Sequence, residues 1–413
     1  MQNTPQPLGL RRSFGFGDRL GLATPGHIDA VKSSNFAPVF AQQSIRELAR
    51  TRRQPGEVML AASGAVAGAG WDRPWGADAD HLQSREDVLR MVAAGFTMFT
   101  IDPSAHVNRD ADSLPPEALE SAAGAMAGRG ASARDIFDLY LGKSFDLDSG
   151  TTVAFTDRTA LLRAFVKYGG AVAHAADMAG WIREARGGAP FELEMSVDET
   201  PHPTSPGEHL FIGLELRRRG VKIVSLAPRF VGDFEKGVDY KGSLALFEEH
   251  YRMHAAIARL CGPYKLSIHS GSDKFSIYPI IGRLSGEHLH VKTAGTSYLE
   301  ALRVVCRTDR ALFREFVAFC RTRYEADKAS YHVSAALKDV PERICDQDLE
   351  RWYLENDSGR QILHVTFGAL LTLGRSPNGR PFKDALLENL ARNAGLYRDA
   401  LRSHLGRHIK LLG

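Results

Sequence analysis

Short apolar runs rich in β-branched and aromatic residues alternate along the chain with longer segments whose apolar residues recur at helical spacing. Such alternation is typical of repeated βα units. Several of the longer segments begin with Ser, Thr or Pro and end with Gly, as helix termini prefer. The short runs predict eight strands, at residues 57–62, 96–102, 191–197, 221–226, 264–269, 288–293, 331–335 and 362–367.

Eight βα units predict the α/β class and a (β/α)8 barrel, the TIM barrel fold. A doubly wound parallel sheet with additional elements would show the same periodicity, and the pattern leaves both open. In the barrel interpretation, residues 1–413 form one domain that begins with a leader over residues 1–55. Residues 103–190 are too many for one helix and predict a helical insertion after the second strand, and residues 380–413 predict two terminal helices.

Polar and charged residues gather in the segments that directly follow the predicted strands. If the strands close into a barrel, these segments share one rim, where such barrels place their active sites. The stretch "HSGSDK" after the fifth predicted strand is the clearest example, because a histidine at the strand end leads into a turn of small hydroxyl and charged residues. The candidate site residues on this rim are Asp80, His81, Glu199, Arg229, Glu235, His269, Ser272, Lys274 and Lys292.

The residue types on this rim favour a metal site beside a site for a small anion. Carboxylates and imidazoles that arrive from separate strands suit a divalent cation held by oxygen and nitrogen ligands. Basic and hydroxyl side chains suit an anionic, polyhydroxylated small molecule. Asp80 and His81 could instead cap a helix, and Arg229 and Lys292 could instead form surface ion pairs.

Composition excludes several other classes of protein. The net charge is only +3, from 52 basic and 49 acidic residues, and no segment concentrates basic residues between aromatic ones, so nucleic acid is not expected as a partner. No stretch approaches the ~20 apolar residues that span a bilayer, and the first residues lack the apolar core of a secretion signal. The four cysteines form no CxxC pair, which indicates reduced thiols and a cytoplasmic location. The oligomeric state stays open, a homo-oligomer included.

Several long motifs together resemble the tagaturonate epimerase family. They include "SFGFGDRLGLATPGH", "GADADHL", "VDETPHPTSPGEH", "GPYKLSIHSGSDKFSIYP" and "HVKTAGTSYLEALR". The resemblance extends over about residues 13 to 410 and is weakest over 103–190. It implies a metal-dependent isomerase of bacterial galacturonate catabolism that interconverts D-fructuronate and D-tagaturonate, which differ at C4. Some relatives of this kind also interconvert fructose and tagatose.

The resemblance also implies roles for individual residues. Asp80 and Glu199 would form a catalytic acid/base pair. His81 and His269 would hold a Zn, Mn or Ni ion together with a third ligand from the segment after the fourth predicted strand, and Glu235 is the predicted third ligand. Arg229, Ser272, Lys274 and Lys292 would contact the substrate. Three residues remain as alternatives for the third ligand: Asp233, Asp239 and His290.

Elementary carbonyl chemistry limits how such an enzyme can invert C4. With the ketone at C2, the hydrogen on C4 is one carbon too far away to be removed as an enolate. A retro-aldol route avoids this difficulty, because a base takes the proton of the C4 hydroxyl, the C3–C4 bond breaks, and the bond re-forms on the other face of the aldehyde. A metal-dependent aldolase of a sugar acid, or a sugar-acid-binding protein without catalysis, would use a similar rim and remains an alternative.

Overall fold

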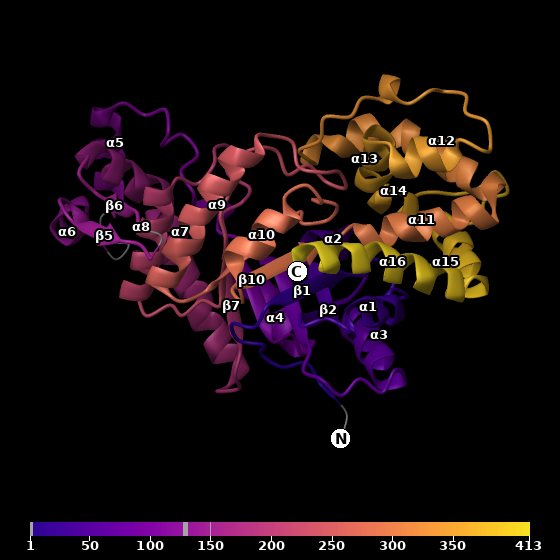
Figure 1. The fold of residues 1–413 in the computed structure, drawn as a ribbon, viewed down its shortest axis with the longest axis horizontal. Coiled ribbons are helices and arrows are strands. Elements are labelled where there is room, and N and C mark those ends of the chain that lie inside the picture. The colour runs from indigo at the N-terminus through magenta and orange to yellow at the C-terminus, as the bar shows by residue number, and fades with distance from the viewer. Residues whose placement is uncertain (1–2, 127–130, 149) are drawn as a thin grey trace.

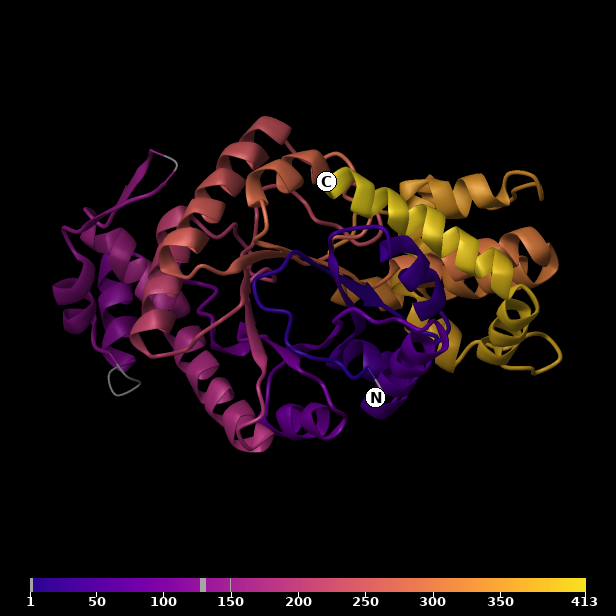
Figure 2. The ribbon, with the colours of Figure 1, turned by 60° about the horizontal axis from the view of Figure 1, so that its bottom comes forward.

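The computed structural model describes residues 3–126, 131–148 and 150–413. Eight parallel strands close into a barrel in the spatial order β1-β10-β9-β8-β7-β4-β3-β2, which Figure 2 shows around the centre of the molecule. The predicted eight-stranded α/β barrel is therefore confirmed, and the doubly wound alternative is wrong. The barrel strands are β1 (Ser13–Gly17), β2 (Ala37–Ser44), β3 (Gly76–Leu82), β4 (Met98–Ile101), β7 (Glu192–Ser196), β8 (Ser225–Ala227), β9 (Lys265–Ile268) and β10 (Leu289–Thr293).

Three of the predicted strands are wrong. Residues 57–62 lie inside helix α3 (Pro55–Gly68), which starts with a proline and a capping box that joins Gln54 to Glu57. Residues 362–367 belong to the helices α13 (Asp357–Val365) and α14 (Phe367–Thr372), and residues 331–335 form no strand. Apolar runs of this length fit a buried helix as well as a strand, and only the flanking capping residues separate the two.

Strands β1, β2 and β3 take the places of the wrongly predicted strands. The first two lie within residues 1–55, so this segment builds the barrel and is not a leader outside it. Strand β3 has no apolar run, and its sequence shows why. Its sequence "GADADHL" alternates alanine with aspartate, and alternate residues of a strand face opposite sides. The alanines face the helices, and the aspartates face the barrel interior, where they contact Lys292.

Helices surround the barrel and bury the outward faces of the strands. The apolar core between the helices and the strands is continuous and includes large, fully buried side chains such as Phe14, Phe40 and Tyr251. Within the described residues, no helix is long and apolar enough to cross a membrane. The helices of the individual βα units are α1 (Thr24–Val31), α2 (Ile45–Thr51), α3, α4 (Arg85–Ala93), α8 (Pro206–Arg218), α9 (Leu244–Cys261), α10 (Tyr278–Ser285) and α11 (Thr296–Thr308).

The segment 103–190 connects β4 to β7. It follows residues 96–102, which were predicted as the second strand and contain the fourth strand of the barrel. Residues 127–130 and 149 of this segment lie outside the described residues. Figure 1 shows its outer part at one end of the long axis of the molecule. Its elements are η1 (Ser104–His106), α5 (Pro116–Ala125), α6 (Ala133–Tyr140), the antiparallel pair β5 (Ser144–Asp146) and β6 (Thr152–Ala154), and α7 (Arg158–Arg186), a long helix that packs against α4 and α8.

A second helical region follows α11 and lies at the opposite end of the long axis (Figure 1). Residues 380–413, predicted as two helices, contain α15 (Phe382–Arg392) and α16 (Ala394–Leu412). Helix α16 returns to the barrel and packs against α1, α10 and α11. The other elements of this region are α12 (Arg310–Asp327), η2 (Lys328–Ser330), η3 (Leu337–Asp339), η4 (Arg351–Glu355), α13 and α14.

Candidate active site

The carboxyl ends of the barrel strands open into a pocket of about 380 Å³. Its walls come from the segments that follow the strands, as the rim argument predicts. Two of the predicted site residues, Glu235 and Lys274, are not part of the pocket wall. The predicted residues that line the pocket are Asp80, His81, Glu199, Arg229, His269, Ser272 and Lys292.

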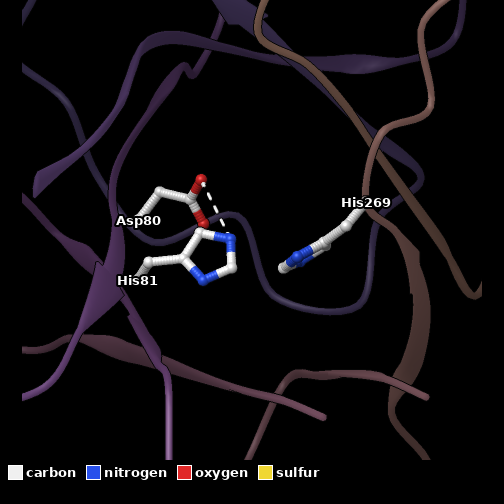
Figure 3. Close-up of side chains that lie close together, drawn as sticks. All are labelled: Asp80, His81 and His269. Atoms are coloured by element: carbon white, nitrogen blue, oxygen red, sulfur yellow. Dashed lines mark ion pairs between the residues drawn. The ribbon is translucent and has the colours of Figure 1, made fainter. Parts of the chain in front are cut away.

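A bulge at the end of β3 aims two consecutive side chains into this pocket. The pairing of β3 with β4 shifts register between Ala79 and Leu82, and His81 has a left-handed backbone with φ of 58°. Side chains of a regular strand alternate between its faces, and a bulge re-aims one of them. Asp80 and His81 therefore both point toward His269, which comes from β9 on the facing wall (Figure 3).

Asp80, His81 and His269 form a compact, buried cluster. Each offers one ligand atom, and these three atoms lie within 4.8 Å of one another. The two imidazole centroids are 5.2 Å apart, and His81 Nε2 lies 3.9 Å from Asp80 Oδ2, the pair that is dashed in Figure 3. The structure thus brings together residues that are almost 190 positions apart in the chain.

Further carboxylates contact both imidazoles. His81 Nδ1 lies 3.4 Å from Asp102 Oδ2, and the two ring nitrogens of His269 lie 2.6 Å from Glu194 Oε1 and 3.2 Å from Asp198 Oδ1. Burial lowers the pKa of His269, but Asp198 and Glu194 outweigh it and raise the pKa to about 10. Carboxylates in these positions orient a histidine and increase its basicity, as they do around metal-bound histidines.

Lys292, on β10, contacts three carboxylates from the two strands β3 and β7 inside the barrel. Its Nζ lies 2.7 Å from Asp80 Oδ1, 2.8 Å from Asp78 Oδ2 and 2.8 Å from Glu194 Oε1. Burial opposes its charge, yet these carboxylates raise the pKa of Lys292 well above its ordinary value. For Asp80, burial raises the pKa, but the charge of Lys292 outweighs it, so the pKa is lowered and this carboxylate is ionised.

The charges around the cluster fit a bound cation. One lysine and two imidazoles face five carboxylates, so negative charge remains in excess even when both imidazoles are protonated. Burial raises the pKa of Asp78 to about 6, as expected for a carboxylate among others. A divalent ion could replace the imidazole protons and compensate this charge, and the mixed oxygen and nitrogen donors suit Zn, Mn or Ni. The carboxylates are those of Asp78, Asp80, Asp102, Glu194 and Asp198.

Glu235, the predicted third metal ligand, does not join this cluster. Its Oε2 accepts hydrogen bonds from Lys241 at 2.8 Å, Ser334 at 2.9 Å and Gln361 at 2.7 Å. These contacts hold the segment after β8 against the helical region, and Asp80 occupies the position beside the imidazoles instead.

The three alternatives for the third ligand also lie elsewhere. Asp233 pairs with His332 at the surface, and Asp239 accepts a hydrogen bond from the Ser276 hydroxyl at 2.9 Å. His290 lies inside the barrel, where Ser13 Oγ is 2.9 Å from its Nδ1. The sequence could not separate these candidates, because the direction of a long loop is not encoded in its spacing.

Lys274 is fully buried and has a different role from the predicted one. Its Nζ donates to the backbone carbonyls of Glu235 at 2.8 Å, Ser272 at 3.2 Å and Val238. The ammonium group therefore joins the segment after β9 to the segment after β8. This corrects the prediction that Lys274 contacts substrate.

Glu199, Arg229 and Ser272 remain on the pocket wall. Glu199 is partly exposed and makes two hydrogen bonds with Arg46, at 2.6 and 2.9 Å. Arg229 donates to the carbonyl of Thr200 and still borders the pocket. Ser272 is buried and also borders the pocket. Glu194 and Asp102 were not predicted as site residues, although an acidic residue within an otherwise apolar run, as in "FELEMSV", was an available signal for Glu194.

A second group of one aspartate and two histidines lies outside the pocket. Asp273 Oδ1 is 2.6 Å from His404 Nε2, and Asp273 Oδ2 accepts a hydrogen bond from Arg360 at 2.7 Å. The backbone N–H of Asp273 donates to His408 Nε2 at 2.9 Å. The ligand atoms of this group are already engaged, and the group fastens the segment after β9 to α13 and α16.

The chain is similar over nearly its whole length to known epimerases. A sequence model of the family described as tagaturonate epimerase matches residues 2–412. The tagaturonate/fructuronate epimerase of Thermotoga maritima is 42% identical over 410 residues, which cover 99% of this chain and 82% of that protein.

Solved structures agree with this similarity. The native crystal structure of the fructuronate-tagaturonate epimerase of Cohnella laeviribosi is 38% identical, with a TM-score of 0.93 and coverage of 100% of this chain and 83% of that one. A crystal structure of the same Cohnella enzyme with one glycerol is 37% identical, with the same TM-score and coverage. The chain is therefore an enzyme of the tagaturonate epimerase family.

Proposed function

We propose that the protein is a divalent-metal-dependent epimerase that inverts C4 of a ketohexuronate and interconverts D-fructuronate and D-tagaturonate. The observation that carries the proposal is the buried cluster of Asp80, His81 and His269 at the base of the pocket. Its excess of negative charge and the names of the similar enzymes support the same function.

His81 and His269 would hold the ion, with an oxygen of Asp80 beside them. Asp102 would fix the orientation of the His81 ring, and Glu194 that of the His269 ring. When bound, the ion supplies a Lewis acid for the oxygens at C2 and C3 of the substrate.

The other residues of the pocket would move the proton that bond cleavage requires. Asp80 and Glu199 are the proposed acid/base pair, and they approach the pocket from β3 and from the segment after β7. Lys292 keeps the Asp80 carboxylate ionised, and Arg46 holds the Glu199 carboxylate in a two-point contact. Both carboxylates are therefore positioned before a substrate arrives.

In the retro-aldol route, one of these carboxylates takes the proton of the C4 hydroxyl. The C3–C4 bond then breaks, the fragment of C1–C3 keeps the electron pair, and C4 becomes an aldehyde. Rotation of this aldehyde presents its other face, the C3–C4 bond re-forms, and the C4 oxygen regains a proton from the acid. No redox partner is needed, because the electrons balance within the substrate.

The test is turnover of D-fructuronate by the full chain reconstituted with Mn²⁺, Ni²⁺ or Zn²⁺, followed by NMR. We expect D-tagaturonate as the product and no accumulation of three-carbon fragments. Accumulated fragments would identify an aldolase. Binding of the sugar acid without turnover under any of the three metals would overturn the proposal in favour of a binding protein.

The variant Asp80→Asn separates the proposed contribution of Asp80 to metal binding from its proposed contribution to proton transfer. Asparagine keeps an oxygen that can ligate a metal but cannot take up a proton. We expect the variant to retain the ion and lose turnover. Loss of the ion together with turnover would assign Asp80 to metal binding, and retained turnover would remove it from the acid/base pair.

A further inference from the structure

One wall of the pocket, beside the start of α11, presents hydrogen-bond donors that have no partner among the described residues. Ala294 and Gly295 border the pocket here. Gly295 is the N-cap residue of α11, and no side chain among the described residues caps this helix. The first N–H groups of a helix lack partners within the helix and carry partial positive charge. Helix α11 follows the eighth barrel strand, the place where many (β/α)8 barrels bind an anionic group.

Arg19 supplies a second, independent donor on this wall. It is only 4% exposed, its Nε donates to Glu47 Oε1 at 2.7 Å, and the guanidinium stacks on the ring of Phe367. Its Nη1 is buried and has no hydrogen-bond partner in the described part of the chain. Because the neighbouring contacts fix the guanidinium, this unpaired N–H group is held in place for a ligand.

His364 supplies a third donor. Its Nε2 lies 3.5 Å from Arg19 Nη2, which can only donate, so the proton of the neutral ring resides on Nδ1. Burial, Arg19 and Lys236 all lower the pKa of His364, which keeps the ring neutral. Nδ1 has no partner among the residues that the structure describes. A Cβ atom on Gly295 would lie only 2.6 Å from Nδ1, which places this donor at the start of α11.

Lys292 and Lys274, the two lysines predicted to meet the substrate, are already engaged. Lys292 is surrounded by three carboxylates, and Lys274 by three carbonyls. A carboxylate in the pocket can therefore use neither lysine without breaking these contacts. The wall beside α11 provides N–H groups from three separate elements and, in Lys236, an additional cation on the pocket lining.

We propose that the uncapped start of α11, Arg19 Nη1 and His364 Nδ1 form an anion subsite that binds the carboxylate of the sugar acid, at the end of the substrate away from the ion. The inference rests on the proposed function, because it places a ketohexuronate in the pocket. It makes this wall the part of the pocket that distinguishes a uronate from a neutral ketohexose of the same length.

The experiment measures binding by calorimetry, with D-galactonate as the anionic probe and galactitol as its neutral counterpart. A hydrogen bond to a charged group contributes about tenfold or more to affinity, so the metal-loaded protein should bind galactonate at least about tenfold more tightly than galactitol. His364→Leu should remove most of this preference. His364→Asn, whose amide can donate from the position of Nδ1, should restore part of it.

Gly295→Ala tests the same subsite without removing His364. The added Cβ would lie 1.9 Å from His364 Cε1, so the ring must leave its position, and the preference for galactonate should fall here too. His106→Leu is the matched control, since His106 lies in η1 outside the pocket lining and should keep the full preference. Thermal unfolding identifies any variant that does not fold. If either His364→Leu or Gly295→Ala fails to fold, the binding preference of the other one tests the subsite.

The outcomes separate this inference from the proposed function. A wild-type protein without preference for galactonate, or a preference that survives in both His364→Leu and Gly295→Ala, would overturn the subsite. Turnover of fructuronate combined with either result would leave the proposed function intact. A preference that is lost in these variants, in a protein that never turns over fructuronate, would support the subsite and refute the epimerase.

Discussion

Two groups of one aspartate and two histidines lie among the residues that the structure describes, and their surroundings differ. Asp80, His81 and His269 border the pocket and face additional carboxylates, so negative charge is left uncompensated. The group of Asp273 lies outside the pocket lining and includes a direct contact with Arg360. The two groups offer the same ligand types at similar distances. If the first group holds the proposed ion, the charge balance and the access to the pocket are what distinguish it from the second.

The largest effect should follow from removing a histidine of the first group. His269→Ala should lower kcat/KM for fructuronate by more than ~100-fold and reduce the bound metal, because a ligand is lost. Elemental analysis and the NMR assay measure the two quantities. His404→Ala removes the same side chain from the second group and should keep the metal content of the wild type. Equal metal contents in His269→Ala and wild type would refute the assignment.

The next effect concerns Lys292, which compensates the carboxylates of the first group. Lys292→Met leaves Asp78, Asp80 and Glu194 buried without their cation and should reduce the free energy of unfolding by about 3–5 kcal/mol, as judged by urea denaturation. Lys236→Met is the control, because this partly exposed lysine contacts the Ser270 hydroxyl and no carboxylate. A loss below ~1 kcal/mol for Lys292→Met would contradict the proposed charge balance.

Arg360→Met should affect stability without affecting the metal. Arg360 contacts Asp273 and donates to the carbonyls of Gly237 and Leu354, so its removal leaves a buried carboxylate and should cost about 3 kcal/mol of unfolding free energy. The metal content should stay at the wild-type value. A matching loss of metal would mean that the second group also controls the first.

A smaller, pH-dependent effect should come from His404. Burial lowers its pKa, but Asp273 and Glu300 outweigh burial and raise the pKa above the ordinary 6.5. The folded protein then binds this proton more tightly than the unfolded chain. The resulting stabilisation is complete below about pH 6.5 and is lost as the pH rises through the raised pKa. Urea denaturation across this range should show the decline, and His404→Gln should flatten it. A parallel decline in that variant would assign the effect to another residue.

The smallest effect is expected for Glu235→Gln. The Glu235 carboxylate is satisfied by Lys241, Ser334 and Gln361, so the bound metal should not change. Elemental analysis of the variant checks this directly. A clear loss of metal would return Glu235 to the list of ligands, as the sequence predicted.

The barrel could be predicted from the sequence because the alternation of strands and helices extends over most of the chain. The positions of three strands could not. Strands β1 and β3 alternate apolar residues with polar or small ones, and the apolar run of β2, "FAPVFA", contains Pro38, which disfavours a strand within a sheet. The period-two pattern of β3, alanine alternating with aspartate, was the signal that could have identified it.

The candidate site likewise contains residues that could be predicted from the sequence and residues that could not. His269 was predicted because it ends a strand, and the barrel geometry brings such positions together. Asp80 and His81 were expected in the segment after residues 57–62, which is helical, and they lie in β3 itself. Glu235 and Lys274 lie in long segments whose direction depends on contacts with the distant helical region. Asp78 and Glu194 lie inside strands, where a polar side chain gives no indication of the partners it will meet.

The left-handed backbone at His81 has a practical consequence for engineering. Asparagine and glycine adopt this conformation readily, whereas a β-branched residue would be strained there. Replacing His81 by glycine should therefore vacate one proposed coordination position while the bulge and the barrel keep their shape. The position is a natural starting point for redesigning the chemistry of this scaffold.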